Sequence, residues 1–432
     1  MKGSSKRCAT ILVAVLGACT ASATMAMAGE SSTKPPDIAA EAAIVVDLDT
    51  GLELWSKNAD TRMYPASLTK MMTGALAIEY GDMDSIVPIS KAVADVDETG
   101  LYLEEGEQIP FRDLVQAVLI WSANDASAAV GEAVAGTVED FVQLMNERAA
   151  QWGARDTHFV NPHGLHDDDH YSTARDLAKI ATHAMRSPIF RQIVAMRSFE
   201  MARPEYVAPA KPEDKAALEP GAGRVRRMTV RKFTNRNRLL TRWELCNGIK
   251  TGYTRHAGNC LAASATSDGW TAVSIVLKSN DSWSDSRALL EWAFATHRRQ
   301  RVVERGQGAW TVRVVDGRAG KVELKPDKDI DLLVPSEGAR VTLRPDVDAL
   351  VAPVEQSEKV GELLVLMSGK VVGRAPLVAA ESVPLSFWGH VKRLALPRPV
   401  EGLLLCLGAG VLLLGTAAKV ACARRNCLPA HR

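Results

Sequence analysis

Two short apolar runs follow one another soon after residue 37, and they predict a β-hairpin. The runs cover residues 43–47 and 52–55, and Asp49-Thr50-Gly51 between them is typical of a turn. A strand pattern returns from Met228, and over residues 249–277 we expect two or three antiparallel strands with a turn near 254–258. Strands therefore lie at both ends of the first 300 residues.

Helical spacing dominates the sequence between these strands. We expect one helix from about residue 65 to 78, and others at 111–121, 125–136, 139–152, 177–185 and 283–296. Thr173 and Asp176 form a capping box ahead of the fifth helix. Residues 203–224 are rich in proline and charge, and we interpret them as a mobile surface excursion that could affect substrate access or partner binding. The mixture of helices and antiparallel strands over residues 38–298 predicts an α+β domain.

The pattern changes beyond residue 300. Short apolar runs separated by turn signals continue to residue 367 without any helical period. The runs lie at 310–314, 322–324, 331–334, 341–343 and 363–367. We therefore expect a small all-β domain over residues 301–383, and we find no catalytic constellation in it.

Both ends of the chain suggest export and membrane attachment. Residues 1–28 combine a basic start, an apolar run and Ala26-Met27-Ala28, which is typical of a cleaved signal peptide. Lipidation of Cys19 is the alternative for this segment. Residues 402–418 are uncharged, at the short end of a membrane span. The span extends to residue 423 if Lys419 snorkels. Basic residues that follow the span predict a cytoplasmic tail at 424–432. We expect a juxtamembrane segment with aromatic and basic residues ahead of the span, at 384–401.

Composition excludes some classes of protein. The 432 residues carry a formal net charge of +1 without a basic stripe, which argues against a nucleic-acid partner. Five of the seven cysteines lie in the predicted signal, anchor or tail. Cys246 and Cys260 would not face each other on the predicted strands, so we expect free thiols rather than a disulfide framework.

Candidate chemistry begins at Pro65-Ala66-Ser67-Leu68-Thr69-Lys70, at the start of the first predicted helix. Residues three apart lie on one helix face, so Ser67 and Lys70 are neighbours. A hydroxyl near a helix N-terminus beside a buried, neutral amine has the features of an activated nucleophile. The spacing alone is weak, since Ser31 and Lys34 repeat it ahead of two prolines that prevent a helix.

Two further motifs give this pair a context. Ser122-Ala123-Asn124 follows a predicted helix, and Lys250-Thr251-Gly252 lies within a predicted strand. The set S-x-x-K, S-x-N and K-T-G in this order is typical of penicillin-binding proteins and serine β-lactamases. The alternative for Ser122 and Asn124 is an ordinary turn at a helix end.

The chain resembles the serine-type D-alanyl-D-alanine carboxypeptidases, the low-molecular-mass penicillin-binding proteins. The resemblance covers residues 38–298 and rests on the three motifs and on further blocks, which include His163-Gly164-Leu165, Asn235-Arg236-Asn237 and Tyr253-Thr254. It implies a transpeptidase-like antiparallel sheet covered by helices. It also matches the family's usual layout of a β-domain followed by a membrane anchor.

The resemblance implies a role for each candidate residue and requires no cofactor. Ser67 would attack the bond between two D-alanines of a peptidoglycan stem peptide, with Lys70 as base, and β-lactams would acylate it. Ser122, Asn124 and Lys250 would complete the proton and hydrogen-bond network. Gly252 and Tyr253 belong to the strand that binds the peptide, and the backbone N–H of Tyr253 would join that of Ser67 in an oxyanion hole. Thr251 and Arg236 would bind the terminal carboxylate, unless Arg236 is only a surface charge.

Other functions stay open at this point. A D,D-endopeptidase would use the same residues, and a catalytically weak penicillin-binding scaffold would keep the motifs without turnover. A β-lactamase is disfavoured because we find no convincing deacylation motif with a glutamate between Ser122 and Lys250. The dense group His163, His166, Asp167, Asp168, Asp169 and His170 could suggest a metal site. We expect a solvated turn instead, and no metal.

Overall fold

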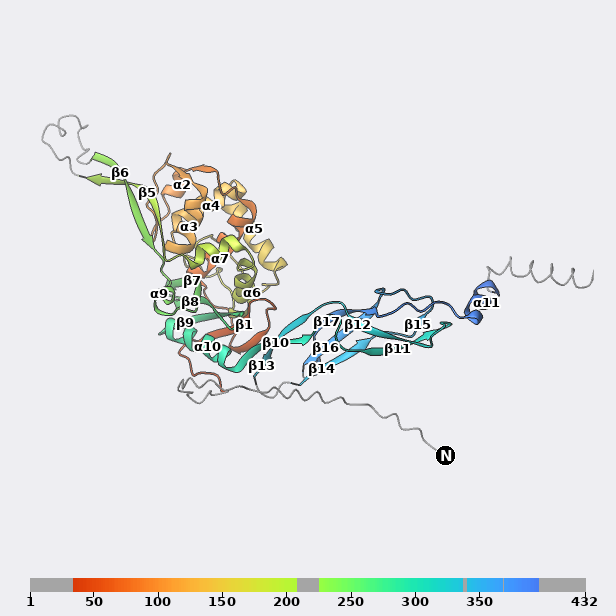
Figure 1. Ribbon diagram of the computed structural model, residues 1–432. Helices are drawn as coiled ribbons and strands as arrows, with labels where there is room; N and C mark the ends of the chain where they lie inside the picture. Colours follow the sequence, from red (N-terminus) through yellow and green to blue (C-terminus); the bar gives the residue numbers. More distant parts are fainter. Residues whose placement is uncertain (1–33, 208–224, 337–339, 368, 396–432) are drawn as a thin grey trace, which may run out of the picture.

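The computed structural model describes residues 34–207, 225–336, 340–367 and 369–395. Over these residues the chain forms a body of helices around one sheet, followed by an elongated β-rich domain (Figure 1).

A five-stranded antiparallel sheet forms the centre of the body. Its order is β2-β1-β9-β8-β7. The bounds are β1 (Ala42–Asp47), β2 (Glu53–Lys57), β7 (Cys246–Thr254), β8 (Gly258–Ser267) and β9 (Trp270–Ser279). The predicted hairpin and the three later strands are confirmed, and the pairing of β1 with β9 joins sequence segments more than 200 residues apart.

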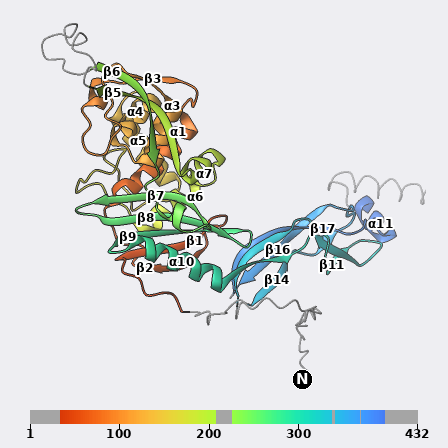
Figure 2. The same cartoon turned by 60° about the vertical axis from the view of Figure 1, so that its left-hand side comes forward.

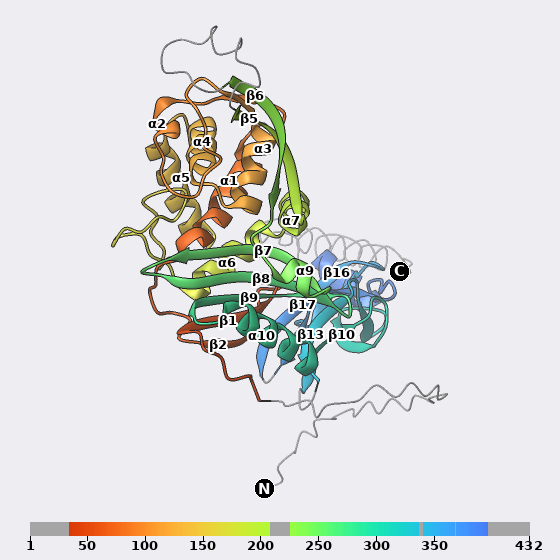
Figure 3. The same cartoon turned by 90° about the vertical axis from the view of Figure 1, so that its left-hand side faces the viewer.

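Both faces of this sheet are buried. In β1, Ile44 and Val46 belong to one hydrophobic core, whereas Ala43 and Val45 belong to another, as the alternation of a strand requires. Helix α10 (Ser282–Thr296) covers the second face, while α1 (Lys70–Tyr80) and α6 (Ala174–Ala184) lie on the first (Figures 2 and 3). The sheet is therefore a middle layer between helices.

The predicted helices are present, with changes at their ends and some additions. The remaining bounds are α2 (Lys91–Ala94), α3 (Phe111–Gln116), α4 (Asn124–Ala135), α5 (Val138–Gln151), α7 (Pro188–Ala195) and α9 (Leu239–Arg242). The N-cap half of the predicted capping box is confirmed at α6, where the Thr173 hydroxyl accepts a hydrogen bond from the Asp176 N–H. The Asp176 carboxylate accepts from the Asp156 N–H and from Lys179. The helix predicted over 111–121 changes character, because α3 continues into a π-helical segment, η2 (Ala117–Trp121).

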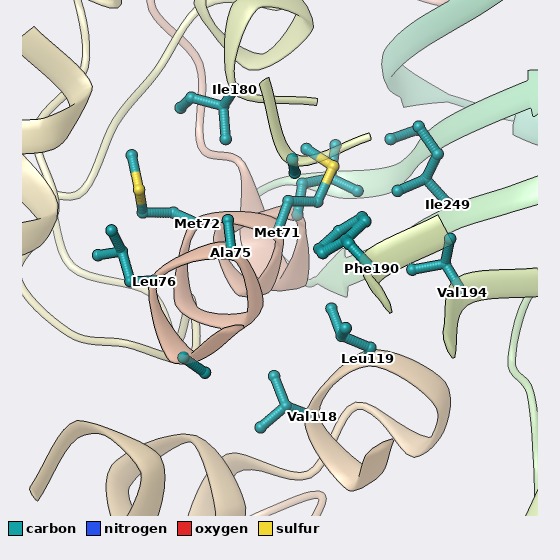
Figure 4. Close-up of a cluster of buried hydrophobic side chains, with 14 of the residues drawn as sticks. Met71, Met72, Ala75, Leu76, Val118, Leu119, Ile180, Phe190, Val194 and Ile249 are labelled. Carbon is teal, nitrogen blue, oxygen red and sulfur yellow. The ribbon is translucent and has the colours of Figure 1, made fainter. Parts of the chain in front are cut away.

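Helix α1 is buried over its first eight residues, Lys70–Ala77. Its residues Met71, Met72, Ala75 and Leu76 pack among Val118, Leu119, Ile180, Phe190, Val194 and Ile249 (Figure 4). These partners come from η2, α6, α7 and β7. Close packing on every side fixes the position of the helix start, where Lys70 lies.

The surface excursion predicted at 203–224 is wrong at its start. Residues 203–207 belong to β5 (Ser198–Val207), which pairs with β6 (Val225–Thr234) in a two-stranded ribbon that projects from the body (Figure 1). Arg203 is buried in this ribbon. The proline and the charged residues argued against a strand here. Pro204 is nevertheless tolerated, because both strands of a two-stranded ribbon are edge strands. Residues 208–224 lie outside the described part.

The C-terminal domain begins with β10 (His297–Val303), which pairs with β13 (Ile330–Pro335). A second sheet has the order β14-β16-β17-β12-β11-β15. Its strands are β11 (Trp310–Val315), β12 (Lys321–Pro326), β14 (Val341–Asp346), β15 (Leu350–Val351), β16 (Lys359–Met367) and β17 (Lys370–Ala379). The predicted all-β character is confirmed, although β10, β15 and β17 were not expected. Leu333 of β13 reaches into the core beneath α10 and ties the domain to the body.

A short helix, α11 (Phe387–Ala395), ends the described residues. No helix within them is long and apolar enough to cross a membrane. The predicted signal peptide at 1–28 and the predicted span at 402–423 both lie outside the described part. The prediction of free thiols is confirmed, since Cys246 and Cys260 are unpaired and face Ala265 and Gly252 across the strands.

Candidate active site

A cleft of about 690 Å³ runs along β7 and brings the predicted motifs together. Its walls contain predicted residues from all three motifs and from the Asn-Arg-Asn block, namely Ser67, Ser122, Arg236, Thr251, Gly252 and Tyr253. Thr99, Trp121, Arg238, Thr241 and Trp283 complete much of the lining. The described residues that line this cleft include two arginines and no carboxylate, so the cleft favours an anionic ligand.

Ser67 lies in a tight 3₁₀ turn, η1 (Ala66–Thr69), directly before α1. The preceding residue, Ala66, has φ +48°, a left-handed conformation that costs about 1 kcal/mol outside glycine. The turn is held from two sides. A Cβ on Gly252 would stand 3.1 Å from the backbone nitrogen of Ser67, and one on Gly164 would overlap the Ala66 carbonyl. Glycine at both positions lets β7 and the 161–165 turn approach the serine closely.

Lys70 is fully buried and contacts three groups. Its Nζ lies 3.2 Å from Ser67 Oγ, 2.7 Å from Asn124 Oδ1 and 2.6 Å from the carbonyl oxygen of His163. Burial lowers the pKa of Lys70 well below its usual range, and the nearby charge of Lys250 lowers it further.

The three contacts suit the neutral form of this amine. A neutral amine has two N–H donors and one lone pair. Asn124 Oδ1 and the His163 carbonyl are acceptors, so they take the two N–H groups and leave the lone pair for the Ser67 hydroxyl. The arrangement is therefore that of a base ready to accept the proton of Ser67.

Asn124 is held by backbone groups of a neighbouring loop. Its N–H donates to the Thr99 carbonyl at 2.7 Å and its Nδ2 donates to the Asp97 carbonyl at 3.3 Å. The second bond also fixes the amide so that Oδ1 faces Lys70. Ser122, two residues before, has φ +71° where the π-helical segment ends, and the turn places it in the cleft. π-helical turns of this kind are common at functional sites.

Lys250 lies on β7 and is also buried. Burial is the main cause that lowers the pKa of Lys250 to about 7, and the charge of Arg236 adds to it. Its ammonium donates to the Thr251 carbonyl at 3.0 Å. A lysine with a pKa near neutrality can both give and take a proton at physiological pH.

Arg236 lies in the cleft wall and is not an isolated surface charge. Its guanidinium stacks on Trp121 at 4.3 Å from the ring centre, and its Nε donates to the Trp121 carbonyl at 2.9 Å. These contacts orient the remaining donors of the fork. Thr251 lines the same cleft from β7. The pair can therefore bind a carboxylate at one end of the cleft.

Strand β7 is the edge of the five-stranded sheet. An extended peptide can add to such an edge through backbone hydrogen bonds. Tyr253 exposes 64% of its surface next to this edge. The cleft thus offers an extended peptide a strand to pair with and a serine to react with.

The histidine and aspartate group at 163–170 has structural contacts. Thr69 Oγ1 lies 2.8 Å from His170 Nε2, and His170 Nδ1 accepts from the Val160 N–H. Burial lowers the pKa of His163 to about 3 and that of His170 to about 4. Among the described residues, no group of three or more His, Cys, Asp or Glu is arranged to hold a metal ion.

Two contributors to the site had no signal in the sequence. The His163 backbone carbonyl binds Lys70, although its motif gave no reason to expect that contact. The buried carboxylate of Asp125 accepts from the N–H groups of Leu101 and Leu103 and so shapes the loop that holds Asn124. A carboxylate next to the S-x-N motif was the only hint of this second contact.

Comparison with known proteins identifies the family. The family model described as D-alanyl-D-alanine carboxypeptidase, peptidase family S11, matches residues 29–281, more than half of the chain. The chain belongs to this family. A second model, the C-terminal domain of penicillin-binding protein 5, matches residues 298–385. The resemblance inferred from the motifs is thereby confirmed.

Individual carboxypeptidases of the family resemble the chain over most of its length. D-alanyl-D-alanine carboxypeptidase DacA of Haemophilus influenzae is 30% identical over 370 residues, 81% of this chain and 86% of that protein. The enzyme DacF of Bacillus subtilis is 28% identical over 373 residues, 83% of this chain and 90% of that protein.

Solved structures of the family show the same fold. The crystal structure of penicillin-binding protein 5 from Haemophilus influenzae matches with a TM-score of 0.64 and 29% identity. The match covers 81% of this chain and 99% of that one. The penicillin-binding-protein-like α+β fold with a following β-rich domain is therefore confirmed.

Proposed function

We propose that the protein is a serine-type D-alanyl-D-alanine carboxypeptidase that removes the terminal D-alanine from peptidoglycan pentapeptides. The observation that carries the proposal is the contact set of Lys70, which leaves the lone pair of a neutral amine for Ser67. β-Lactams would acylate the same serine, because they present a reactive carbonyl to it in place of the peptide.

Acylation would begin with proton transfer from Ser67 Oγ to Lys70 Nζ as the oxygen attacks the carbonyl carbon of the penultimate D-alanine. The backbone N–H groups of Ser67 and Tyr253 would donate to the developing oxyanion, a type of interaction that usually contributes about 3 to 4 kcal/mol. The close approach of Gly252 to the Ser67 nitrogen supports this pairing of donors.

Collapse of the tetrahedral intermediate would break the C–N bond. The leaving D-alanine nitrogen takes the proton that Lys70 accepted from Ser67, relayed by Ser122 and Lys250, so Lys70 becomes neutral again. Water then attacks the ester carbonyl and gives its proton to Lys70, and Ser67 Oγ regains a proton as the ester C–O bond breaks. Both half-reactions use the same base, and neither needs a cofactor.

Recognition of the substrate would depend on its free carboxylate. Arg236 and Thr251 would bind this group, while the edge of β7 pairs with the peptide backbone. A D,D-endopeptidase would use the same machinery on crosslinked peptides. Its leaving group is a whole peptide, so the assay below distinguishes the two reactions.

The direct test is release of D-alanine from a peptide that ends in D-Ala-D-Ala, compared with release of a peptide from a purified crosslinked dimer. We expect wild-type protein to release D-alanine and Ser67→Ala to release none. Preferential cleavage of the dimer would identify an endopeptidase. Labelling by penicillin without either product would identify a scaffold protein.

We further propose that the protein is exported and held at the membrane by residues 402–423, with the catalytic domain outside the cytoplasm. The aromatic residues of α11 support attachment near a membrane surface, because Phe387 and Trp388 expose 75% and 70% of their area. Lys392 and Arg393 in the last turn bond Asp316 and the Ala352 carbonyl, which holds α11 on the C-terminal domain with its aromatic residues exposed.

A further inference from the structure

A buried ion pair joins the β5–β6 ribbon to the catalytic body. Arg203 of β5 and Glu107 lie 2.5 Å apart, and their side chains expose only 2% and 6% of their area. Neither residue belongs to the motifs of the family discussed above. Burying a pair of charges costs desolvation energy, so we expect other contacts of Arg203 to offset that cost.

The guanidinium of Arg203 holds more than its partner carboxylate. Nη1 bonds Glu107, while Nη2 donates to the carbonyls of Tyr102 at 2.9 Å and Leu101 at 3.2 Å. One guanidinium group thus binds both the 101–102 carbonyls and the side chain of Glu107. These residues belong to the segment 97–107, which we term the cleft-wall segment. Arginine is suited to this because its donors are fixed in a plane.

The cleft-wall segment supports the catalytic groups from the other side. Carbonyls of Asp97 and Thr99 accept from Asn124, and the carbonyl of Gly100 accepts from Trp121 Nε1 at 3.2 Å. Asn124 in turn bonds Lys70, and Trp121 carries Arg236. The segment therefore contacts both the base and the carboxylate-binding arginine through one residue each.

The conformation of this segment needs external support. Glu98 and Tyr102 have φ values of +71° and +56°, which are unfavourable for side chains other than glycine. Asp125 holds the N–H groups of Leu101 and Leu103 from the body. Arg203 holds the carbonyls of the same stretch from the ribbon.

The ribbon also stabilises Trp121 directly. Phe199 of β5 stacks on Phe233 of β6 at 5.1 Å, and Phe233 contacts the Trp121 ring edge to face at 5.5 Å. The ribbon therefore contacts the cleft-wall segment through Arg203 and contacts Trp121 through Phe233. This position distinguishes Arg203 from the exposed ion pairs elsewhere on the body.

We infer that Arg203 is a positioning residue for acylation. It fixes the cleft-wall segment, and the segment keeps Asn124 against Lys70 in the geometry that activates Ser67. This inference rests on the proposed acyl-enzyme mechanism. Displacements of about 1 Å in such an arrangement can lower rates by about 100-fold.

The test separates positioning from stability. Arg203→Met removes the carbonyl contacts but leaves Glu107 buried without this partner, so the melting temperature should fall as well. The double variant Arg203→Met/Glu107→Met removes both charges and should recover much of the melting temperature. We expect the rate constant for acylation by a fluorescent penicillin to fall about 10- to 100-fold in both variants.

Arg175→Met is the matched control. Like Arg203, Arg175 joins distant segments through several hydrogen bonds, in this case to the carboxylates of Glu53 and Asp60. It is not among the residues that line the cleft. We expect this variant to lower the melting temperature while its acylation rate stays at the wild-type value.

Two results would overturn the inference. One is an unchanged acylation rate in a folded Arg203 variant, and the other is an acylation rate that recovers in the double variant together with stability. Absence of labelling in the wild type would instead contradict the proposed function itself, so the two failures are distinguishable.

Discussion

At the scale of single residues, the chemistry of the cleft depends on two buried lysines with different roles. Burial favours the neutral form of Lys70, and in that form the acceptors Asn124 Oδ1 and the His163 carbonyl can take both N–H groups, which leaves the lone pair for Ser67. Lys250 has no such set of acceptors, and the pKa of about 7 leaves it partly protonated at neutral pH. In the proposed mechanism, Lys70 would therefore accept a proton and Lys250 would supply one.

The pH dependence of acylation follows from these states. The rate should rise with pH as Lys70 loses its proton, at a pH well below the usual lysine pKa. It should fall again near pH 7 as Lys250 loses its proton, since its lowered pKa is about 7. Rate constants for penicillin acylation measured over about pH 5 to 9 test this.

A variant of Lys250 tests whether this residue causes the decrease in acylation rate at alkaline pH. Lys250→Arg keeps a group that stays protonated throughout the range, so the decrease near pH 7 should disappear even though the maximum rate is lower. A decrease that persists in this variant would show that another group titrates.

Arg236 makes a separate prediction about the substrate carboxylate. Arg236→Gln should lower kcat/KM about 10- to 100-fold for a peptide with a free terminal carboxylate, because a hydrogen bond to a charged group contributes about 1.5 to 3 kcal/mol. The same peptide with a terminal amide is the control, and the variant should not change its slower turnover. Equal losses on both peptides would mean that Arg236 acts on the cleft and not on the carboxylate.

Sequence could predict those site residues whose side-chain type carries the chemistry. Ser67, Lys70, Asn124 and Lys250 were expected together. In the structure Ser67 lines the cleft, Lys70 joins it to Asn124, and Lys250 lies on β7 next to the cleft residue Thr251. The backbone carbonyls of Asp97, Thr99 and His163 were not expected, because every residue has a carbonyl and only the fold decides where it points. Arg203 was hidden for a similar reason, since its partners lie about 100 residues away.

At the scale of elements, the contact between β7 and η1 decides how close the peptide-binding strand comes to the nucleophile. Gly252→Ala places a Cβ 3.1 Å from both the Pro65 carbonyl oxygen and the Ser67 nitrogen. Both neighbours are backbone atoms, so the strand or the turn must shift. We expect acylation to slow about 10-fold or more.

Gly320→Ala is the control for this substitution. A Cβ at Gly320, in the C-terminal domain, would meet no atom within 4 Å. Its melting temperature and acylation rate should match those of the wild type. Wild-type acylation by Gly252→Ala would mean that the tight contact has no role in catalysis.

Elements with a clear period were predictable, whereas others depended on tertiary contacts. The continuous apolar run of β1 and the helical pattern over residues 283–296 were sufficient to predict β1 and α10. Strand β6 was predicted from Met228 onward, but β5 was missed because proline and charge dominate the sequence from residue 203, while the ribbon is stabilised by Phe199, Phe233 and Arg203 packing on the body. The π-helical end of the 111–121 helix has no periodic signal either.

At the scale of the whole molecule, a catalytic body and a β-rich domain are joined through β10 and β13. We predict that removing residues 396–432 releases the exported protein from the membrane fraction, because the predicted span lies there. Penicillin labelling of the released form should be retained, since the described residues that line the cleft lie between Ser67 and Trp283. Immunoblots of cell fractions test this.

The N-terminal alternative supplies the control. If Cys19 is lipidated, the shortened protein stays with the membrane until Cys19→Ala is added. Membrane retention of the shortened Cys19→Ala protein would contradict anchoring by either end and would assign attachment to α11 or another surface.

The central claim is that Ser67 forms the acyl-enzyme. The most direct measurement is mass spectrometry of the full-length protein after reaction with benzylpenicillin, with the adduct located by proteolysis. We predict one penicilloyl group on the peptide that contains Ser67, and none in Ser67→Ala. An adduct on another residue, or an unmodified wild-type protein, would contradict the account.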